Sequence, residues 1–285
     1  MRKSVLVTGA STGLGLETAL HLAEQGFEVY ASMRDDDSRG KIEEAAARRG
    51  VSLQVLKLDI REQGEIDKAV AGIVERSGGI YGLVDNAGVG LRGYFEDLSD
   101  EEIRELFNVN IFATMAVTRA VLPHMRKAGQ GRIAIITSVG GLISALSVSA
   151  YCASKFAQEG FGEGLAQEVR PFGIYVSLVE PAIIETERWG INRSIARGAR
   201  DPQSVYYKWF NGSERLADRL VETSPTKPVA VARAVHKVMS ARRPRLRYLV
   251  GGRAALVVAL RRYLPAPLFE RIYFGTAIRR VTRAG

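Results

Sequence analysis

The feature that most constrains the fold of this 285-residue chain is a regular alternation of short apolar runs with longer stretches of helical spacing. Six runs rich in Val, Ile and Leu predict strands at Val5–Val7, Glu28–Ala31, Leu53–Leu58, Tyr81–Val84, Ile133–Thr137 and Tyr175–Val179. Helices are predicted between them at Leu14–Gln25, Lys41–Arg49, Gln63–Arg76, Asp100–Lys127 and Tyr151–Arg170. Such alternation requires right-handed crossovers and predicts an α/β fold, a single doubly wound parallel sheet.

The alternation breaks over Ile183–Ser224, which is long, polar and aromatic, and resumes with a helix at Val229–Met239 and a strand at Tyr248–Val250. We therefore expect one domain over residues 1–252, with an insertion at about 183–226 after the sixth strand. A basic amphipathic tail over 253–285 follows. From Arg242 to Gly285 there are 11 arginines and one acid, Glu270, whereas the rest of the chain is nearly neutral.

The N-terminal Met1-Arg2-Lys3 imitates the start of a signal peptide, but the apolar run that follows stops at Gly9. No stretch approaches the ~20 apolar residues that span a bilayer, and a single cysteine, Cys152, excludes an intrachain disulfide. These features favour a cytoplasmic protein. The tail has two interpretations. It packs on the insertion or on a partner subunit, or its Arg/Leu pattern lies on an anionic membrane surface.

Two ligand classes are disfavoured. Nucleic-acid binding needs interleaved aromatics and a broad basic face and is the least favoured interpretation of the tail, so no nucleic-acid partner is expected. His21, His124 and His236 stand isolated, without the paired spacing of metal ligands, so no metal site is expected.

A glycine-rich turn follows the first predicted strand. Gly9, Gly13 and Gly15 form the pattern G-x-x-x-G-x-G at the start of a helix. Glycine permits positive φ and lets a pyrophosphate approach the backbone, and a helix N-terminus favours the anion. The turn therefore predicts dinucleotide binding, with a tight turn that binds nothing as the structural alternative.

Further motifs follow the later strands: Asp85-Asn86-Ala87-Gly88, the series Asn110, Ser138, Tyr151 and Lys155, and Pro181 with Thr186. Together with the glycine turn they resemble the short-chain dehydrogenase/reductase superfamily from about Lys3 to Val250. The segment from Ser138 to Lys155 is similar to the estradiol-type hydroxysteroid and retinol dehydrogenase branch. The resemblance implies a Rossmann domain whose insertion is a substrate lid. Asp85 and Ala182 depart from the family's Asn and Gly.

The cofactor implied is a nicotinamide dinucleotide. An acid after the second strand is typical of NAD binding and an arginine of NADP binding. Arg34 stands there, beside Asp35–Asp37, so we expect NADP, with NAD as the alternative. The resemblance implies cofactor contacts from Gly9, Ser11, Thr12, Gly13, Leu14, Gly15, Arg34, Asp59, Asn86, Ala87, Gly88, Tyr151, Lys155, Pro181 and Thr186.

The reacting groups follow from the chemistry of ketone reduction, which needs a proton donor and a stabiliser for the developing oxyanion. Tyr151 and Lys155 lie four residues apart and share a helix face. A cation about 4 Å from a phenol is sufficient to bring its pKa towards neutral pH. The resemblance implies that Tyr151 is the general acid or base and that Lys155 assists it. It further implies that Ser138 binds the substrate oxygen and that Asn110 (with Asn108 as the rival) holds a relay water.

The expected substrate is a lipophilic carbonyl or alcohol, such as a steroid, retinoid or other lipid. Aromatic residues fill the lid, although packing of the lid itself explains any one of them equally well. Ser138, Val139, Tyr151 and Trp189 are the candidate substrate contacts. A nucleotide-sugar epimerase and a non-enzymatic dinucleotide-sensing or membrane-recruited module are the alternatives. The family commonly forms homodimers or homotetramers, so we expect a homo-oligomer.

Overall fold

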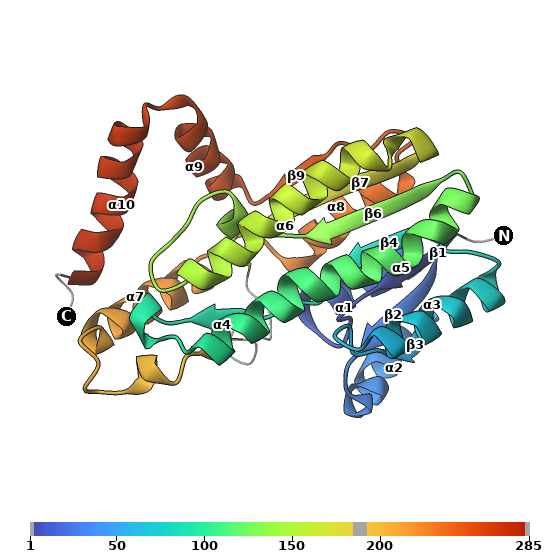
Figure 1. Cartoon of the computed structure of the whole chain (residues 1–285), viewed down its shortest axis with the longest axis horizontal. Helices are drawn as coiled ribbons and strands as arrows, with labels where there is room; N and C mark the ends of the chain where they lie inside the picture. Colours follow the sequence, from blue (N-terminus) through green and yellow to red (C-terminus); the bar gives the residue numbers. More distant parts are fainter. Residues whose placement is uncertain (1–2, 185–192, 283–285) are drawn as a thin grey trace.

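The computed structural model describes residues 3–184 and 193–282. Its centre is a sheet of seven parallel strands in the order β3-β2-β1-β4-β6-β7-β9 (Figure 1). In chain order these strands are β1 (Ser4–Val7), β2 (Glu28–Met33), β3 (Gln54–Lys57), β4 (Gly82–Asp85), β6 (Gly131–Ile136), β7 (Ile174–Pro181) and β9 (Arg247–Val250). The strand order reverses between β1 and β4, which confirms the predicted doubly wound fold.

Both faces of the sheet are buried, as continuous apolar strands require. Val5 and Val7 of β1 point into one core, and Leu6 points into the other. The first core lies under α1, α2 and α8, and the second lies under α3, α5 and α6. The helices are α1 (Gly13–Glu24), α2 (Arg39–Arg48), α3 (Gln63–Ser77), α4 (Asp100–Phe107), α5 (Thr114–Lys127), α6 (Ser149–Glu168), α7 (Tyr207–Glu222), α8 (Pro228–Ser240), α9 (Gly252–Tyr263) and α10 (Ala266–Thr282).

The helix predicted over Asp100–Lys127 is not uniform. It consists of α4, a π-helical segment at Asn108–Ala113, and α5. A capping box formed by Ser99 and Glu102 is present at its start. Among the described residues this is the one helix long and apolar enough to cross a bilayer, against our expectation from composition. Several of its apolar side chains, such as Val117 and Val121, are fully buried against the sheet, whereas Phe112 is exposed.

The insertion after β7 contributes strand β8 (Arg193–Ile195), which pairs in parallel with β5 (Gly90–Arg92), and then α7. This small two-stranded sheet was not predicted, because three-residue strands leave no periodic signal. It connects the insertion to the chain that follows β4.

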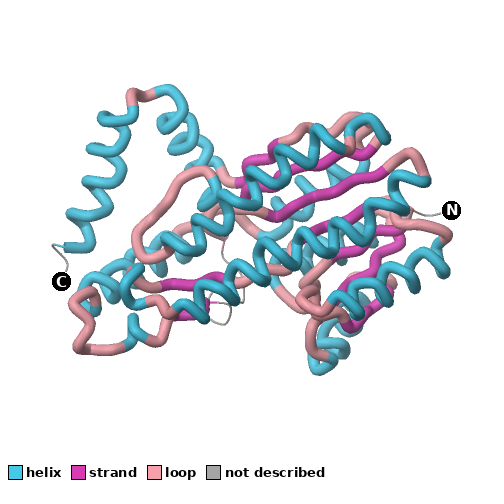
Figure 2. The backbone as a smooth tube through the Cα atoms, in the orientation of Figure 1, coloured by secondary structure: helices cyan, strands magenta, loops and turns pink. Residues whose placement is uncertain are grey.

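The C-terminal tail forms a helical hairpin, α9 and α10, that stands away from the sheet (Figures 1 and 2). Helix α10 contacts α7 of the insertion, where a Cβ on Gly212 would lie 3.3 Å from the carbonyl oxygen of Val281. This contact matches the expectation that the tail packs on the insertion. Arg247 does not belong to a solvated basic surface, because in β9 it binds the carboxylates of Glu159, Glu163 and Glu180.

The packing of α6 on the sheet yields a test with a matched control. A Cβ added to Gly162 would lie 2.5 Å from Cδ2 of the buried Leu178, whereas one added to Gly164 would meet nothing within 4 Å. Both changes to alanine gain helix propensity, worth about 1 kcal/mol. We expect Gly162→Ala to be less stable than Gly164→Ala by about 1–3 kcal/mol in unfolding free energy. In urea denaturation, Gly162→Ala should therefore have the lower midpoint concentration. Equal stability of the two variants would contradict this packing.

Candidate active site

The predicted site residues gather at the carboxyl edge of the sheet. Gly9 follows β1, Asn86 follows β4, and Ser138 follows β6. Because parallel strands end at the same edge, residues far apart in sequence meet there. The amide of Asn86 donates to the carbonyl oxygens of Thr8 (2.9 Å) and Gly9 (3.0 Å), which joins the first and fourth loops.

The glycine turn is as close-packed as a dinucleotide cradle requires. Gly9 and Gly13 have positive φ, +64° and +57°. A Cβ on Gly9 would lie 2.8 Å from Cα of Ala87, and one on Gly15 would lie 2.3 Å from the carbonyl oxygen of Gly9. Thr12 precedes α1 and, within the described part of the chain, its side chain caps none of the helix amides. The turn therefore fits a pyrophosphate at the start of α1.

Ser138 and Tyr151 are brought together although they lie 13 residues apart. Ser138 Oγ accepts a hydrogen bond of 2.9 Å from the amide of Gly140, and its hydroxyl lies close enough to the phenol of Tyr151 to lower the pKa of that group. The short turn over Val139–Gly141 places them so, because it returns the chain onto α6. Val139, a predicted substrate contact, is half-buried in this turn.

Lys155 lies one turn along α6 from Tyr151 and is buried. Its Nζ donates to the carbonyl oxygen of Ile136 (3.1 Å) and to Oε1 of Gln158 (2.8 Å). Nζ lies 5.9 Å from the centroid of the Tyr151 ring. A Cβ on Gly88 would lie 3.9 Å from the same Nζ, so the loop after β4 passes close to the ammonium group.

The electrostatics differ from the expectation of a phenol made acidic by its lysine. Burial raises the pKa of Tyr151, and the hydrogen bond with Ser138 only partly opposes this rise. Burial also lowers the pKa of Lys155 to about 8, against the attraction of Glu159. The reason is that both groups lose water, while the hydrogen bonds of the ammonium group go to Ile136 and Gln158 rather than to the phenol oxygen.

Asn110 lies in the π-helical segment and is fully buried, whereas its rival Asn108 is exposed. Its side-chain amide donates to the carbonyl oxygen of Val89 and to Ser154 Oγ, each at 3.0 Å, and its Oδ1 accepts from the amide of Val89. Its backbone carbonyl accepts from Gln158 Nε2 at 2.7 Å. Asn110 thus joins the loop after β4 to α6, and its part in a proton relay stays a prediction.

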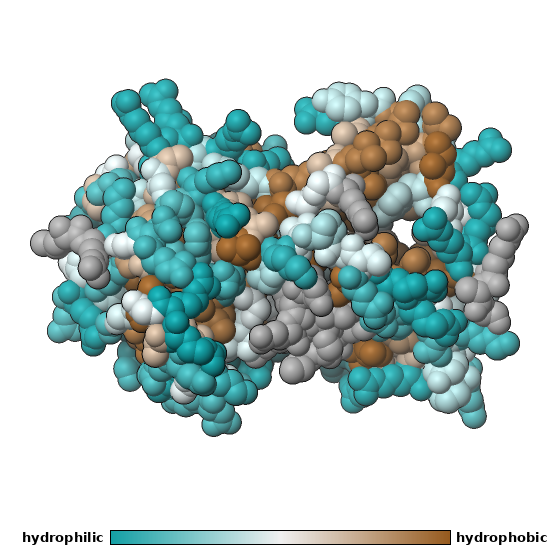
Figure 3. Space-filling model, turned by 180° about the vertical axis from the view of Figure 1, so that it is seen from behind, coloured by the Kyte–Doolittle hydropathy of each residue, from teal (hydrophilic) through white to brown (hydrophobic). Residues whose placement is uncertain are grey.

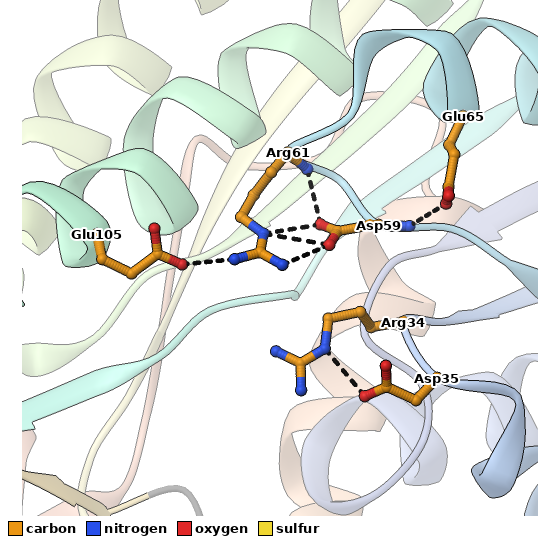
Figure 4. Close-up of polar contacts among 6 residues, drawn as sticks. All are labelled: Arg34, Asp35, Asp59, Arg61, Glu65 and Glu105. Carbon is orange, nitrogen blue, oxygen red and sulfur yellow. Dashed lines mark hydrogen bonds and ion pairs between the residues drawn. The ribbon is translucent and has the colours of Figure 1, made fainter.

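The residues expected to bind adenosine lie farther along the same sheet edge, after β2 and β3 (Figure 4). Arg34 follows β2, is largely exposed, and pairs with Asp35 at 2.9 Å. Asp59 follows β3, and Arg61 holds the pKa of its carboxyl below the usual range. Arg61 also bridges to Glu105 at 2.7 Å. Arg61 was not among the predicted site residues. It could have been recognised as a basic side chain two residues after Asp59.

Two predicted residues, Thr186 and Trp189, lie outside the described residues. Pro181 ends β7, opposite Val250 of β9. Ala182 stands where the resemblance implied glycine. Its methyl group fits because the residue opposite is Gly251, where an added Cβ would lie 2.6 Å from the Cβ of Ala182.

The aromatic residues of the insertion split between two roles. Tyr206 stacks on Tyr94 with centroids 4.9 Å apart, which is packing within the insertion and β5 region. Phe210 of α7 belongs to an apolar cluster against which Tyr151 itself packs. The buried members of that cluster are Leu91, Leu106, Ala150, Ala196, Ala199 and Phe210. The space beside the phenol is therefore bordered by apolar side chains.

Neither cysteine nor histidine chemistry is indicated. Cys152 is buried, and burial raises the pKa of its thiol, so it is not an activated nucleophile. His21 packs edge-on against His236 with centroids 5.7 Å apart. Within the described residues no group of three or more His, Cys, Asp or Glu side chains is placed to hold a metal ion.

Comparison with known proteins gives a consistent result. A sequence profile of the family described as short chain dehydrogenase matches residues 3–194. Retinol dehydrogenase 8 of Bos taurus is 36% identical over 93% of this chain and 86% of its own length. Human 17-beta-hydroxysteroid dehydrogenase type 1 is 41% identical over 65% of this chain and 58% of its own length.

Solved structures agree. A short-chain dehydrogenase from Streptomyces avermitilis superposes with a TM-score of 0.80 at 31% identity, covering 98% of both chains. A variant of actinorhodin polyketide ketoreductase, solved with NADPH, superposes with a TM-score of 0.73 at 30% identity, covering 88% of this chain and 96% of the other.

Asp85, which stands where the resemblance implied asparagine, gives a pH-dependent test. Burial raises the pKa of this carboxyl to about 7, although Thr118 donates to it at 2.8 Å. Because folding raises this pKa, the free energy of unfolding falls as pH increases from about 4 to 7 and stays lower above that range. We expect Asp85→Asn to raise the melting temperature at pH 8 more than at pH 5. The exposed Asp67→Asn serves as control, and identical gains at both pH values would contradict the assignment.

Proposed function

The chain belongs to the short-chain dehydrogenase family, and from that premise we propose that it transfers a hydride between NADP(H) and the carbonyl or alcohol group of a lipophilic substrate. Family membership makes it an oxidoreductase that acts on CH–OH groups. The observation that carries the proposal is the juxtaposition of Ser138, Tyr151 and Lys155 at the sheet edge, one loop away from the glycine turn.

Each side chain has one task in this proposal. A bound nicotinamide would supply or accept the hydride. Tyr151 gives its proton to the carbonyl oxygen in reduction and removes the alcohol proton in oxidation. Ser138 Oγ accepts from Gly140 and lies beside the phenol, and in this role its own proton turns to the substrate oxygen, where it stabilises negative charge. Lys155 would hold the ribose hydroxyls of the cofactor and supplies positive charge 5.9 Å from the centroid of the Tyr151 ring.

Preference for NADP rests on Arg34. A guanidinium has the planar geometry that matches a phosphate, and this one extends into solvent after β2 on the same side as Asp59 (Figure 4). The 30%-identical ketoreductase solved with NADPH supports the same choice. NAD is the alternative.

The lipophilic substrate rests on the apolar cluster beside Tyr151, which a carbon skeleton would extend. The relatives named for retinol and 17-beta-hydroxysteroids support a steroid-, retinoid- or lipid-like ketone or secondary alcohol. The epimerase and non-enzymatic alternatives are not favoured, since the relatives are named dehydrogenases.

The tail leaves the predicted membrane contact open. Its hairpin exposes Leu256, Leu260, Leu268 and Ile272, and brown apolar surface is visible there (Figure 3). Arginines such as Arg261 and Arg271 lie on the same two helices. Membrane contact, homo-oligomer formation, cytoplasmic location and the division at residue 252 stay predictions.

Replacing the phenol tests the reaction. Tyr151→Phe removes the proton that the carbonyl oxygen requires, so kcat for NADPH-dependent reduction of lipophilic ketones should fall at least about 100-fold. The dissociation constant for NADPH should change little. Tyr263→Phe, at a tail position 78% exposed, is the matched control. Turnover that survives in Tyr151→Phe would refute the proposed mechanism.

Reversing the charge at Arg34 tests the cofactor. Arg34→Asp removes a charged hydrogen-bond donor worth about 1.5–3 kcal/mol, so the KM for NADPH should rise by about 10- to 100-fold while that for NADH stays nearly constant. Arg48→Asp changes an equally exposed arginine on α2 and should affect neither cofactor. A similar rise for both cofactors would contradict the NADP preference.

A further inference from the structure

Gln158 is a buried amide, 1% exposed, in contact with the proposed catalytic lysine. It lies on α6 three residues after Lys155, so both side chains project from the same side of the helix. Lys155 Nζ donates to Gln158 Oε1 at 2.8 Å, and Gln158 Nε2 donates to the backbone carbonyl of Asn110 at 2.7 Å. The ammonium group and the π-helical segment are thus joined by one side chain.

The orientation of this amide is determined by its neighbours. The Asn110 carbonyl can only accept, so Nε2 must face it, and Oε1 then faces an ammonium group that can only donate. Thr114 Oγ1 donates to the same carbonyl at 3.0 Å, so both lone pairs of the Asn110 oxygen are occupied by protein donors. The amide therefore bridges Lys155 and the Asn110 carbonyl directly.

We propose that Gln158 is a positioning residue for Lys155. Its side-chain oxygen, together with the carbonyl of Ile136, holds the ammonium group in place, and its NH2 group is fixed by the carbonyl of Asn110. The proposal rests on the function proposed above for Tyr151 and Lys155. Gln158 touches neither substrate nor cofactor in this role. It presents a fixed acceptor that a protonated lysine satisfies better than a neutral one.

The charges around Lys155 are few, which makes the acceptor important. On α6 itself, Tyr151 lies one turn before Lys155 and Glu159 one turn after it. The carboxylate of Glu159 is bound by Arg247 of β9. Neutral groups face it from the other elements: the carbonyl of Ile136 on β6, and Asn110 and Thr114 through Gln158. Since burial lowers the pKa of Lys155 to about 8, loss of one acceptor matters near physiological pH.

Cofactor binding provides a readout that does not depend on turnover. We would measure the NADPH dissociation constant by fluorescence from pH 6.5 to 10 in a Tyr151→Phe parent, where the phenol cannot titrate. Affinity should weaken above the pH at which Lys155 loses its proton. Gln158→Met removes the acceptor and should lower the pH at which the NADPH affinity begins to weaken, which we call the break, by about one unit. Gln158→Glu adds a carboxylate beside the ammonium group and should move it higher.

Opposite shifts in the two variants are the signature of the proposal, because a merely structural role would not change sign. Gln167→Met, an exposed position on the same helix, should keep the break of the parent. Should one variant fail to melt cooperatively, the direction of the other decides. If Tyr151→Phe is inactive and neither Gln158 variant moves the break, the role of Gln158 alone is overturned. If Tyr151→Phe still turns over substrate, the proposed function is overturned.

Discussion

The burial of one positive charge, on Lys155, constrains the arrangement of three elements. An ammonium group removed from water must have its protons accepted, or its charged form is lost. Its acceptors come from the end of β6 and from α6, and through Gln158 they extend to the π-helical segment before α5. The turn over Val139–Gly141 must also lie close to α6, since a Cβ on Gly141 would lie 2.8 Å from the Lys155 carbonyl oxygen.

Desolvation acts on the phenol and the ammonium group in a related way. It favours the neutral form of each, so it raises the pKa of Tyr151 and lowers that of Lys155. In the proposed mechanism a protonated Tyr151 is the form that donates to a carbonyl oxygen in reduction. The hydrogen bonds that Lys155 donates oppose the loss of its charge, which in the same proposal assists the phenol.

The two ends of the candidate site are built differently. The reacting end is buried and its groups are held by hydrogen bonds from several elements, whereas Arg34 at the adenosine end is exposed and, among the contacts described, pairs with its neighbour in sequence. Asp59 is neutralised by Arg61 rather than left as a free acid. The proposed recognition at that end thus relies on exposed arginine side chains, whereas the proposed reacting groups lie in a closely packed interior.

The sequence by itself determined the parallel sheet, its doubly wound form and the residues that follow each strand, because hydrophobic periodicity and the glycine turn are local properties. It favoured Asn110 over Asn108 by spacing, and in the structure Asn110 is buried whereas Asn108 is exposed. Only the tertiary structure decided the π-helical segment, the contact of Gln158 with Lys155, and the direction of the Tyr151 pKa. Each of these depends on which groups lose water and which partners from distant strands replace it, and no local pattern encodes that balance.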